Sequence, residues 1–514
     1  MEPPGALEGH RLELEQDKDS LSLIQERRAA FETKRAALNE QLSLIQAEMR
    51  AVDTVFEQIQ QEEEILRKSI SAHRAALGPL PTFPEELLSE IFSYTCAGYE
   101  DYDDDDLVQI NPARAKAPFT ASSVCRRWRD AAFGAAKLWH CVLIPRLDSN
   151  AQRDEPTHIL SYVKLVLARS RDSSVDIVFR YYEEDQSAVY DPIMDALVPQ
   201  RERWRRFVAT ISGPSVVRSL TEILSLSLPR LRTVDLAYQP NPDNWSLSIS
   251  DETYTFEVHS QCLANAPSLR ALALANIPWP WPDVSASAAK LHTLDLVQHE
   301  FSSDIWNILT SQSSLEWAMF AGHSVPEAPP SVEINFSKLG TLWLRSEAAT
   351  LFAHGSTQIR LPALDRLILT DVSIAQLEPL FTSIRAHLKN LELRRPGDVD
   401  VDALRALAKL SAIEYLFFSS AISDELLTGL RDTARRPVMW PKLARIELGN
   451  ADIRDPENNM ALLEVARARS NGDPARDENG DAVWSKVWFE FTGMVNLLPW
   501  QRDEIEQINA FVKM

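Results

Sequence analysis

Apolar side chains recur with a period of seven along the first part of the chain. With Leu14 as position a of the heptad, fourteen of the nineteen a and d positions between residues 14 and 77 are apolar, and no Gly or Pro interrupts them. This pattern predicts one long helix over residues 11–77 with a coiled-coil seam. Arg28, Arg35 and Glu63 place charges in that seam. Two interpretations stay open: self-association of two chains, and a solvated helix that packs on its own protein.

A second amphipathic helix is predicted shortly after residue 80. Thr82 and Glu85 have the spacing of a capping box, and Pro84 suits a first helical turn. Four apolar side chains then fall on one broad face of the helix, namely Leu87, Leu88, Ile91 and Phe92. That face needs a cover, which either the rest of the chain or another protein must supply.

The next stretch, residues 97–118, is poor in apolar residues, and six acidic residues crowd into positions 100–106. Mutual repulsion predicts a mobile loop here. A calcium site is the alternative, but the stretch lacks the turn glycine and the closing Glu of a calcium-binding hand loop. Beyond it, Val124 and Trp128 have helical spacing in a pattern that Gly134 can end, and a short strand follows.

The long C-terminal part contains a repeat. Nine segments of the form L-x-x-L-x-L, or a close variant of it, begin between Leu231 and Leu443, and from Leu269 onward they start 22 to 30 residues apart. A period of about 20–29 residues with this pattern predicts leucine-rich repeats, each of which contributes one short strand to a curved solenoid. Less regular strands are expected near residues 139–144, 175–180 and 204–211, and a cap over residues 451–514.

The helices expected within residues 78–144 form a small module. Domains this short usually need a disulfide, a metal ion or a partner to complete their core. The spacing of the four cysteines of the chain indicates neither a metal site nor a disulfide bond in this module. A partner chain is therefore the expected cover for the apolar helix faces, and a self-contained bundle is the alternative.

The order of residues in this module resembles the F-box, which docks on the small adaptor subunit of cullin-based ubiquitin ligases. The residues on which this resemblance rests are Phe83, Pro84 and Glu85, the pairs Leu87 with Leu88 and Ile91 with Phe92, the run from Val124 to Arg129, and Leu138 with Trp139. A coiled coil, an F-box and a leucine-rich tail in this order are similar to the large F-box families of mushroom-forming fungi. Two features depart from the F-box pattern: Phe83 stands where Leu is usual, and the acidic insertion separates the first helix from the others. The resemblance implies an adaptor-binding surface made of Leu80, Phe83, Pro84, Leu87, Leu88, Ile91, Phe92, Val124, Cys125, Trp128, Leu138 and Trp139.

Side-chain alternation along each repeat strand assigns the leucines to the core and the residue between the last two leucines to the opposite, concave face. This position is occupied by Asp235, Ala273, Asp295, Met319, Trp343, Ile368, Glu392, Phe417 and Glu447. Neighbouring large side chains predict an exposed apolar cluster with acidic ends, which is typical of a protein interface. We expect a target protein to bind at Trp317, Met319, Trp343, Ile368, Tyr415 and Phe417. The alternatives are cover by a loop and a one-residue slip in register, which would reverse every side chain.

Composition narrows the function further. A formal net charge of −21 disfavours nucleic acid and anionic membranes as partners. No apolar run approaches the ~18–20 residues of a membrane-spanning helix, and the N-terminus lacks the order of a signal peptide, so we expect a cytoplasmic or nuclear protein. Motifs for phosphate binding, for a nucleophilic serine and for a zinc protease are absent, and the ten histidines are scattered. We expect no catalytic residues, no metal site and no cofactor.

The sequence thus predicts an α/β protein: a coiled-coil helix (11–77), a small all-α F-box-like module (78–144, with an acidic insertion at 97–118), a leucine-rich-repeat solenoid (145–450) and a C-terminal cap (451–514). Two functions fit these parts. The first is a substrate receptor of a cullin-type ubiquitin ligase, with adaptor, cullin and a target protein as partners. The second is a coiled-coil and repeat scaffold outside any ligase. An enzyme with a site hidden in the tail is disfavoured, because the repeat pattern occupies most of the tail.

Overall fold

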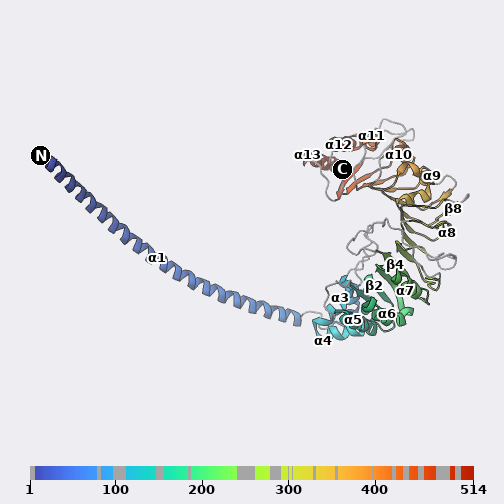
Figure 1. Cartoon of the computed structure of the whole chain (residues 1–514), viewed down its shortest axis with the longest axis horizontal. Coiled ribbons are helices and arrows are strands. Elements are labelled where there is room, and N and C mark those ends of the chain that lie inside the picture. Colours follow the sequence, from blue (N-terminus) through green and yellow to red (C-terminus); the bar gives the residue numbers. More distant parts are fainter. Residues whose placement is uncertain are drawn as a thin grey trace. The chain divides into compact units, whose positions relative to one another are not determined.

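The computed structural model is of mixed α/β type, and contact density divides the chain into two compact units, Met1–Leu87 and Leu88–Met514 (Figure 1). The structure describes residues 6–77, 83–96, 112–145, 155–182, 187–239, 261–277, 291–298, 300–303, 305–327, 332–353, 357–395, 399, 401–419, 424–431, 439–449, 456–470, 487–492 and 499–513.

The first unit consists mainly of α1 (Ala6–Leu77), a single helix of 72 residues. The predicted long helix is therefore confirmed, and it begins five residues earlier than the heptad pattern indicated. Every described side chain of α1, over residues 8–73, is exposed. Ion pairs one turn apart support the helix, among them Arg28 with Glu32 at 2.9 Å and Arg67 with Glu63 at 2.7 Å.

The described part of the predicted small module contains three helices and a 3-10 turn: α2 (Glu85–Cys96), α3 (Pro112–Val124), α4 (Arg126–Gly134) and η2 (Ala136–Trp139). The assignment of residues 112–118 to the acidic loop was wrong, because these residues form the first half of α3. Pro112 occupies the first helical position, where a missing N–H costs nothing. Residues 97–111, which hold the acidic run, lie outside the described residues.

Among the described residues, a parallel sheet of thirteen strands dominates the second unit. Each strand pairs with the next one along the chain, apart from β8 and β10, which form a separate two-stranded sheet. The strands of the main sheet are β1 (Cys141–Ile144), β2 (Val175–Tyr182), β3 (Trp204–Ile211), β4 (Thr233–Tyr238), β5 (Ala271–Ala275), β6 (Thr293–Val297), β7 (Trp317–Gly322), β9 (Thr341–Ser346), β11 (Arg366–Thr370), β12 (Asn390–Arg394), β13 (Tyr415–Phe418), β14 (Arg445–Gly449) and β15 (Trp488–Thr492). The small sheet contains β8 (Val332–Asn335) and β10 (Thr357–Arg360).

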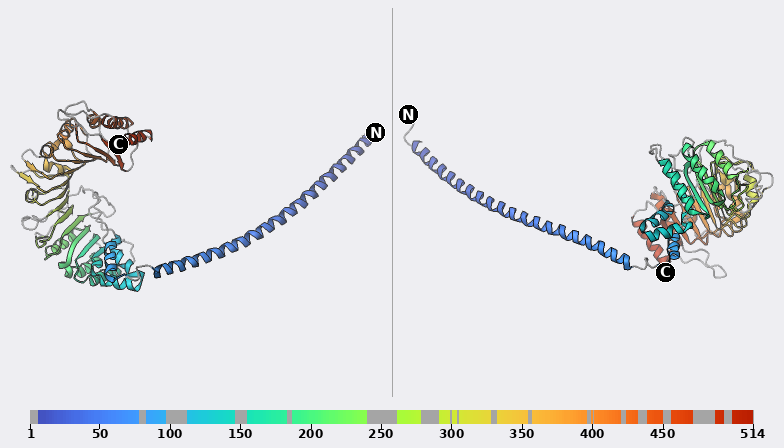
Figure 2. Two further views of the ribbon diagram at one scale, coloured as in Figure 1. Left: turned by 180° about the vertical axis from the view of Figure 1, so that it is seen from behind. Right: turned by 90° about the horizontal axis from the view of Figure 1, so that it is seen from below.

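Helices and 3-10 turns connect the strands and lie along one face of the main sheet (Figure 2). All nine strands predicted from the repeat pattern occur, as do the three irregular strands before them. The pattern gave no sign of β8, β10 or β15. The connecting elements are α5 (Glu155–Ser170), α6 (Ser187–Leu197), η4 (Val198–Arg203), α7 (Pro214–Leu224), α8 (Ile305–Ser311), η6 (Glu347–Phe352), η7 (Ile374–Leu377), α9 (Glu378–Ile384), α10 (Val401–Leu407), α11 (Asp424–Arg431), α12 (Pro456–Ser470) and α13 (Pro499–Lys513).

The register of the sheet matches the predicted alternation. Leu342 and Leu344 of β9 are fully buried, and Trp343 between them points to the opposite face of the sheet. Strand by strand, the predicted inner positions pair with one another from Asp235 in β4 to Glu447 in β14. No one-residue slip occurs among these strands. We call this side of the sheet the inner face; α3 lies against it at β1 and β2, where Ala115 packs on Cys141 and Val178.

Several strands end in the same backbone turn. Asn276, Ser346, Asp371 and Arg395 each lie three residues after the inner-face residue of their strand, and each has a φ between 48° and 55°. This left-handed conformation is uncommon for residues other than glycine. Its recurrence at one position shows that the chain leaves these strands through a repeated turn.

Candidate functional site

The apolar surface of α2 is divided between two faces. Leu88 and Phe92 are 0% and 2% exposed, and the ring of Phe92 lies 4.9 Å from that of Trp128 in α4. Leu87 and Ile91, by contrast, are 51% and 40% exposed. Tyr94 continues this outer face one turn further and is 74% exposed. Within the described residues, one apolar face of α2 is therefore covered by the chain itself and the other is open.

A buried tryptophan fixes the core of the module. Trp139 is 1% exposed, and its indole Nε1 donates a hydrogen bond to the carbonyl oxygen of Ala132 at 2.8 Å. Phe119 of α3 packs edge-on against it at 5.0 Å. The guanidinium of Arg169, at the end of α5, lies 4.3 Å from the Trp139 ring and 3.7 Å from that of Phe133. Part of this core is thus supplied from outside residues 78–144.

Charged contacts join the module to the sheet in the same region. Asp176 of β2 is 1% exposed, and its Oδ1 accepts a hydrogen bond from Arg205 Nε at 2.8 Å. Arg114 of α3 and His140 each approach the other carboxylate oxygen to 3.9 Å. Burial lowers the pKa of His140 below its ordinary value, which favours the neutral ring. Helix α3 is therefore built onto β1 and β2 rather than standing alone.

The residues predicted to bind the adaptor divide into four groups. Leu80 lies outside the described residues. Leu88, Phe92, Leu138 and Trp139 are at most 2% exposed, so they belong to the chain's own core and their assignment to a contact surface was wrong. Phe83 and Trp128 are half-buried. The exposed members are Pro84, Leu87, Ile91, Val124 and Cys125.

Sequence reasoning missed Tyr94 as a surface residue of this helix. It follows Leu87 by seven positions and Ile91 by three, which is the spacing of one helix face. That spacing was the available signal. We use the name "outer face of α2" for Leu87, Ile91 and Tyr94.

The predicted apolar cluster on the inner face exists, but its centre is not exposed. Met319, Trp343 and Ile368 are 6%, 9% and 1% exposed and pack together with Ala321 and Val297. The prediction of an exposed cluster was wrong for these three residues. Trp317, Tyr415 and Phe417 are half-buried and retain surface.

Two polar contacts hold Trp343 in place. Its indole Nε1 donates a hydrogen bond to Thr370 Oγ1 at 2.9 Å, and the guanidinium of Arg394 lies 5.0 Å from its ring. Arg394 in turn donates to Glu392 Oε2 at 3.0 Å, and Arg366 donates to the other carboxylate oxygen of Glu392. Glu392, which is 2% exposed, is thus a buried carboxylate held between two arginines.

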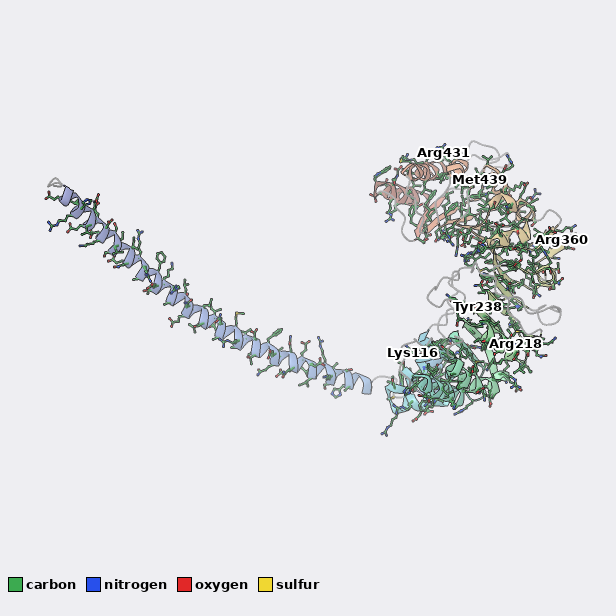
Figure 3. The ribbon with its side chains drawn as sticks, viewed as in Figure 1. Lys116, Arg218, Tyr238, Arg360, Arg431 and Met439 are labelled. Atoms are coloured by element: carbon green, nitrogen blue, oxygen red, sulfur yellow. The ribbon has the colours of Figure 1, made fainter. Side chains whose placement is uncertain are left out.

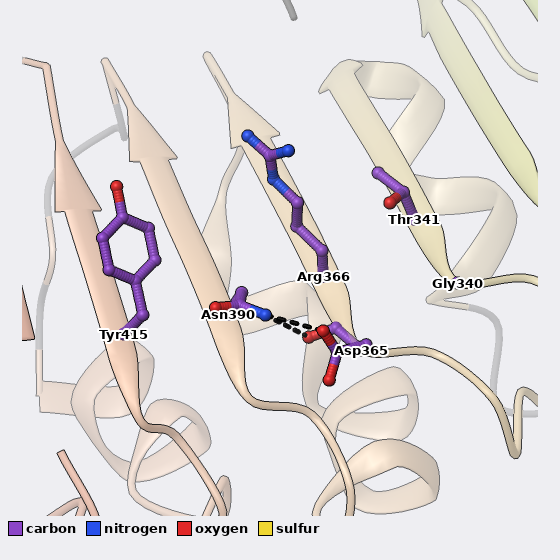
Figure 4. A pocket seen from close by; sticks show the side chains of 6 residues that line it. All are labelled: Gly340, Thr341, Asp365, Arg366, Asn390 and Tyr415. Carbon is purple, nitrogen blue, oxygen red and sulfur yellow. Dashed lines mark hydrogen bonds between the residues drawn. The ribbon is translucent and has the colours of Figure 1, made fainter. Parts of the chain in front are cut away.

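A shallow pocket of about 430 Å³ lies on the inner face at the ends where β9, β11, β12 and β13 begin (Figure 4). Asn390 Nδ2 donates to Asp365 Oδ2 at 2.7 Å across its floor, and the hydroxyl of Tyr415 donates to Glu447 Oε2 at 2.8 Å. The pocket offers both donors and acceptors beside the half-buried ring of Tyr415, which suits a polar segment of a protein partner. Its lining consists of Gly340, Thr341, Asp365, Arg366, Asn390 and Tyr415.

Two buried carboxyl groups flank Ala273 further along the inner face. Asp235 of β4 and Asp295 of β6 are 9% and 1% exposed, and neither carboxyl oxygen of Asp295 has a hydrogen-bond partner among the residues that the structure describes. Burial raises the pKa of Asp235 to about 6, against the lowering effect of Arg206. Burial and the nearby charge of Asp235 raise the pKa of Asp295 well above its ordinary value.

These shifts predict that Asp235→Asn stabilises the protein in alkaline solution. A raised pKa in the folded state favours the neutral carboxyl, so the wild-type protein loses stability as pH rises from 3.8 through about 6. The shift of about two units corresponds to about 3 kcal/mol at pH 8, and the difference should vanish near pH 4. Urea unfolding of the variant and the wild type across this range measures it, and Asp295→Asn should act in the same direction. A difference in stability that does not change with pH would show that Asp235 stays ionised in the fold.

Three further features bear on the class of function. Within the described ranges, no helix is both long and apolar enough to cross a membrane. The same part of the chain contains no group of three or more His, Cys, Asp or Glu side chains placed to hold a metal ion. No family model matches the chain, and no curated protein resembles it significantly in sequence.

Proposed function

We propose that this chain is the substrate-recognition subunit of a cullin-type ubiquitin ligase, an F-box protein whose parallel sheet is a leucine-rich-repeat solenoid. The outer face of α2 is the observation that carries this proposal. Large apolar side chains at Leu87, Ile91 and Tyr94 stay in water although their neighbours Leu88 and Phe92 are buried. Exposed apolar residues on one face of a helix are what a partner protein buries when it binds.

The solenoid part of the proposal rests on the regular succession of strands. The nine strands of the main sheet from β4 to β14 arise from segments of one pattern, and successive strands of the main sheet pair in parallel along the chain. Side chains of the leucine positions, such as Leu367 and Leu391, are fully buried between the sheet and the helices. Stacked units of this kind create extended inner surfaces that bind proteins.

In this proposal the inner face holds the target. The polar pocket beside Tyr415 and the half-buried rings of Trp317 and Phe417 supply its contact groups, and Trp317 packs against the buried cluster of Met319, Trp343 and Ile368. The chain itself acts as a receptor without catalytic residues, and other subunits of the ligase transfer ubiquitin. Such a receptor would work in the cytoplasm or the nucleus.

Binding of the isolated adaptor tests the proposal directly. The purified chain mixed with the purified adaptor subunit should elute as one complex in size-exclusion chromatography, because the adaptor covers the outer face of α2. Separate elution of two folded proteins would favour the alternative function, a coiled-coil and repeat scaffold outside any ligase.

A further inference from the structure

The apolar seam of α1 has no cover within the described part of the chain. The side chains of the helix stand in solvent on all sides (Figure 3), and those at the a and d positions are as exposed as the rest. Leu38, Ile45 and Phe56 are 55%, 57% and 59% exposed. A helix of 72 residues is about 108 Å long, and water is a poor solvent for an apolar stripe of that length.

We propose that α1 pairs with α1 of a second copy of this chain in a parallel, in-register, two-stranded coiled coil. The second copy supplies the apolar surface that the seam requires, because its identical stripe of a and d residues covers the seam along its full length. This pairing does not depend on the proposed receptor function.

Charges beside the seam select the parallel orientation. In a parallel pair, each g residue faces the e residue five positions later on the other helix. Glu13 then meets Lys18 of the second copy, Arg27 meets its Glu32, and Glu62 meets its Arg67. These three contacts attract and each occurs twice in a symmetric pair. One contact of this kind repels, between Glu48 and Asp53 of the second copy.

An antiparallel pair of full overlap gives the opposite balance. The g residues then face g residues and the e residues face e residues. Arg27 still meets Glu62, which has the opposite charge. Lys18, however, meets Arg67, and Glu32 meets Asp53, so these two contacts join like charges and repel. The charge pattern therefore disfavours the antiparallel arrangement.

Two of the charged residues inside the seam, Arg28 and Glu63, fit a two-stranded coil. Arg28 Nε already donates to Glu32 Oε1 at 2.9 Å, and Glu63 pairs with Arg67 at 2.7 Å on the same helix. Both partners occupy e positions, at the edge of the seam. Only a two-stranded coil leaves the a positions close enough to solvent for these side chains to keep such contacts at the edge.

Sedimentation equilibrium of the full chain at micromolar concentration tests the pairing, with an expected mass of about twice 58.0 kDa. The structure offers matched variants. Ile45→Glu with Leu66→Glu places charges at two d positions and should give monomers. Leu44→Glu with Ile65→Glu changes the adjacent residues, which are 59% and 66% exposed but lie at c positions, and should leave the dimer intact. A monomeric wild-type chain, or equal masses for the two variants, would overturn the proposal.

Leu21→Cys tests the orientation. In the parallel register both copies place this a position side by side, so mild oxidation should link the two chains in high yield. In the antiparallel pair Leu21 lies beside Leu66 of the second copy, and no such link can form. The unchanged chain, with its own exposed Cys125, is the control for links formed elsewhere. A dimer that Leu21→Cys fails to link beyond this control would refute the parallel arrangement.

Discussion

Replacing Leu87 and Ile91 together by Asp should abolish adaptor binding and leave the fold unchanged. Both side chains lie on the outer face of α2, where a partner would bury them. Apolar anchors at the centre of an interface typically contribute 2 kcal/mol or more each, so the affinity should fall by at least about 100-fold. Titration calorimetry with the purified adaptor measures the loss.

The matched control replaces two other surface leucines, Leu165 of α5 and Leu226 after α7, by Asp. Each is 38% exposed, close to the exposure of Ile91, and neither belongs to the module. This control should bind the adaptor like the wild type. Equal binding by the Leu87 and Ile91 variant, with circular dichroism and thermal unfolding unchanged, would refute the assignment of this face. Leu88→Asp is unsuitable for the test, because it puts a charge into the core.

Trp343→Ala should destabilise the second unit by about 3–5 kcal/mol, the usual cost of removing a buried tryptophan. The variant leaves a cavity among Met319 and Ile368 and removes both the hydrogen bond to Thr370 and the contact with Arg394. Equilibrium unfolding in urea, followed by far-ultraviolet circular dichroism, gives the free energy of unfolding.

Two controls bracket the result for Trp343. Leu342→Ala, in the core between sheet and helices, should cost about 2–5 kcal/mol. Trp500 of α13 is 48% exposed, and Trp500→Ala should change stability far less than either. If Trp343→Ala behaved like Trp500→Ala, the ring would be open to solvent, and the inner face would carry the exposed apolar cluster that the sequence indicated.

The strands and their register could be predicted because several residues in each repeat carry the same information. Alternation along L-x-x-L-x-L separates leucines from inner-face residues, and the repeat distance aligns Met319, Trp343 and Ile368 side by side. Alternation reports the face of a side chain and not its depth. Trp343 has large neighbours on both adjacent strands and Arg394 over its ring, and these contacts arise only when the strands come together.

The same limit explains the result for α2. Its sequence shows one broad apolar face, but it cannot show that Trp128 of a later helix covers Phe92 and leaves Ile91 open. The size argument predicted that a partner covers the whole face. That argument did not consider packing of the module on the first strands, which α3 achieves through Ala115 against Cys141 and Val178. The error over residues 112–118 has a related cause, because low apolar content says little about a helix that buries small residues.

The most direct measurement of the central claim is co-precipitation of the full-length chain with a cullin from cells that express its natural partners. The proposed receptor function predicts that adaptor and cullin are both recovered with the wild-type chain. It also predicts that both are lost from the Leu87 and Ile91 double Asp variant and retained by the Leu165 and Leu226 control. Recovery of neither subunit with a folded wild-type chain, or equal recovery with the double variant, would contradict the account.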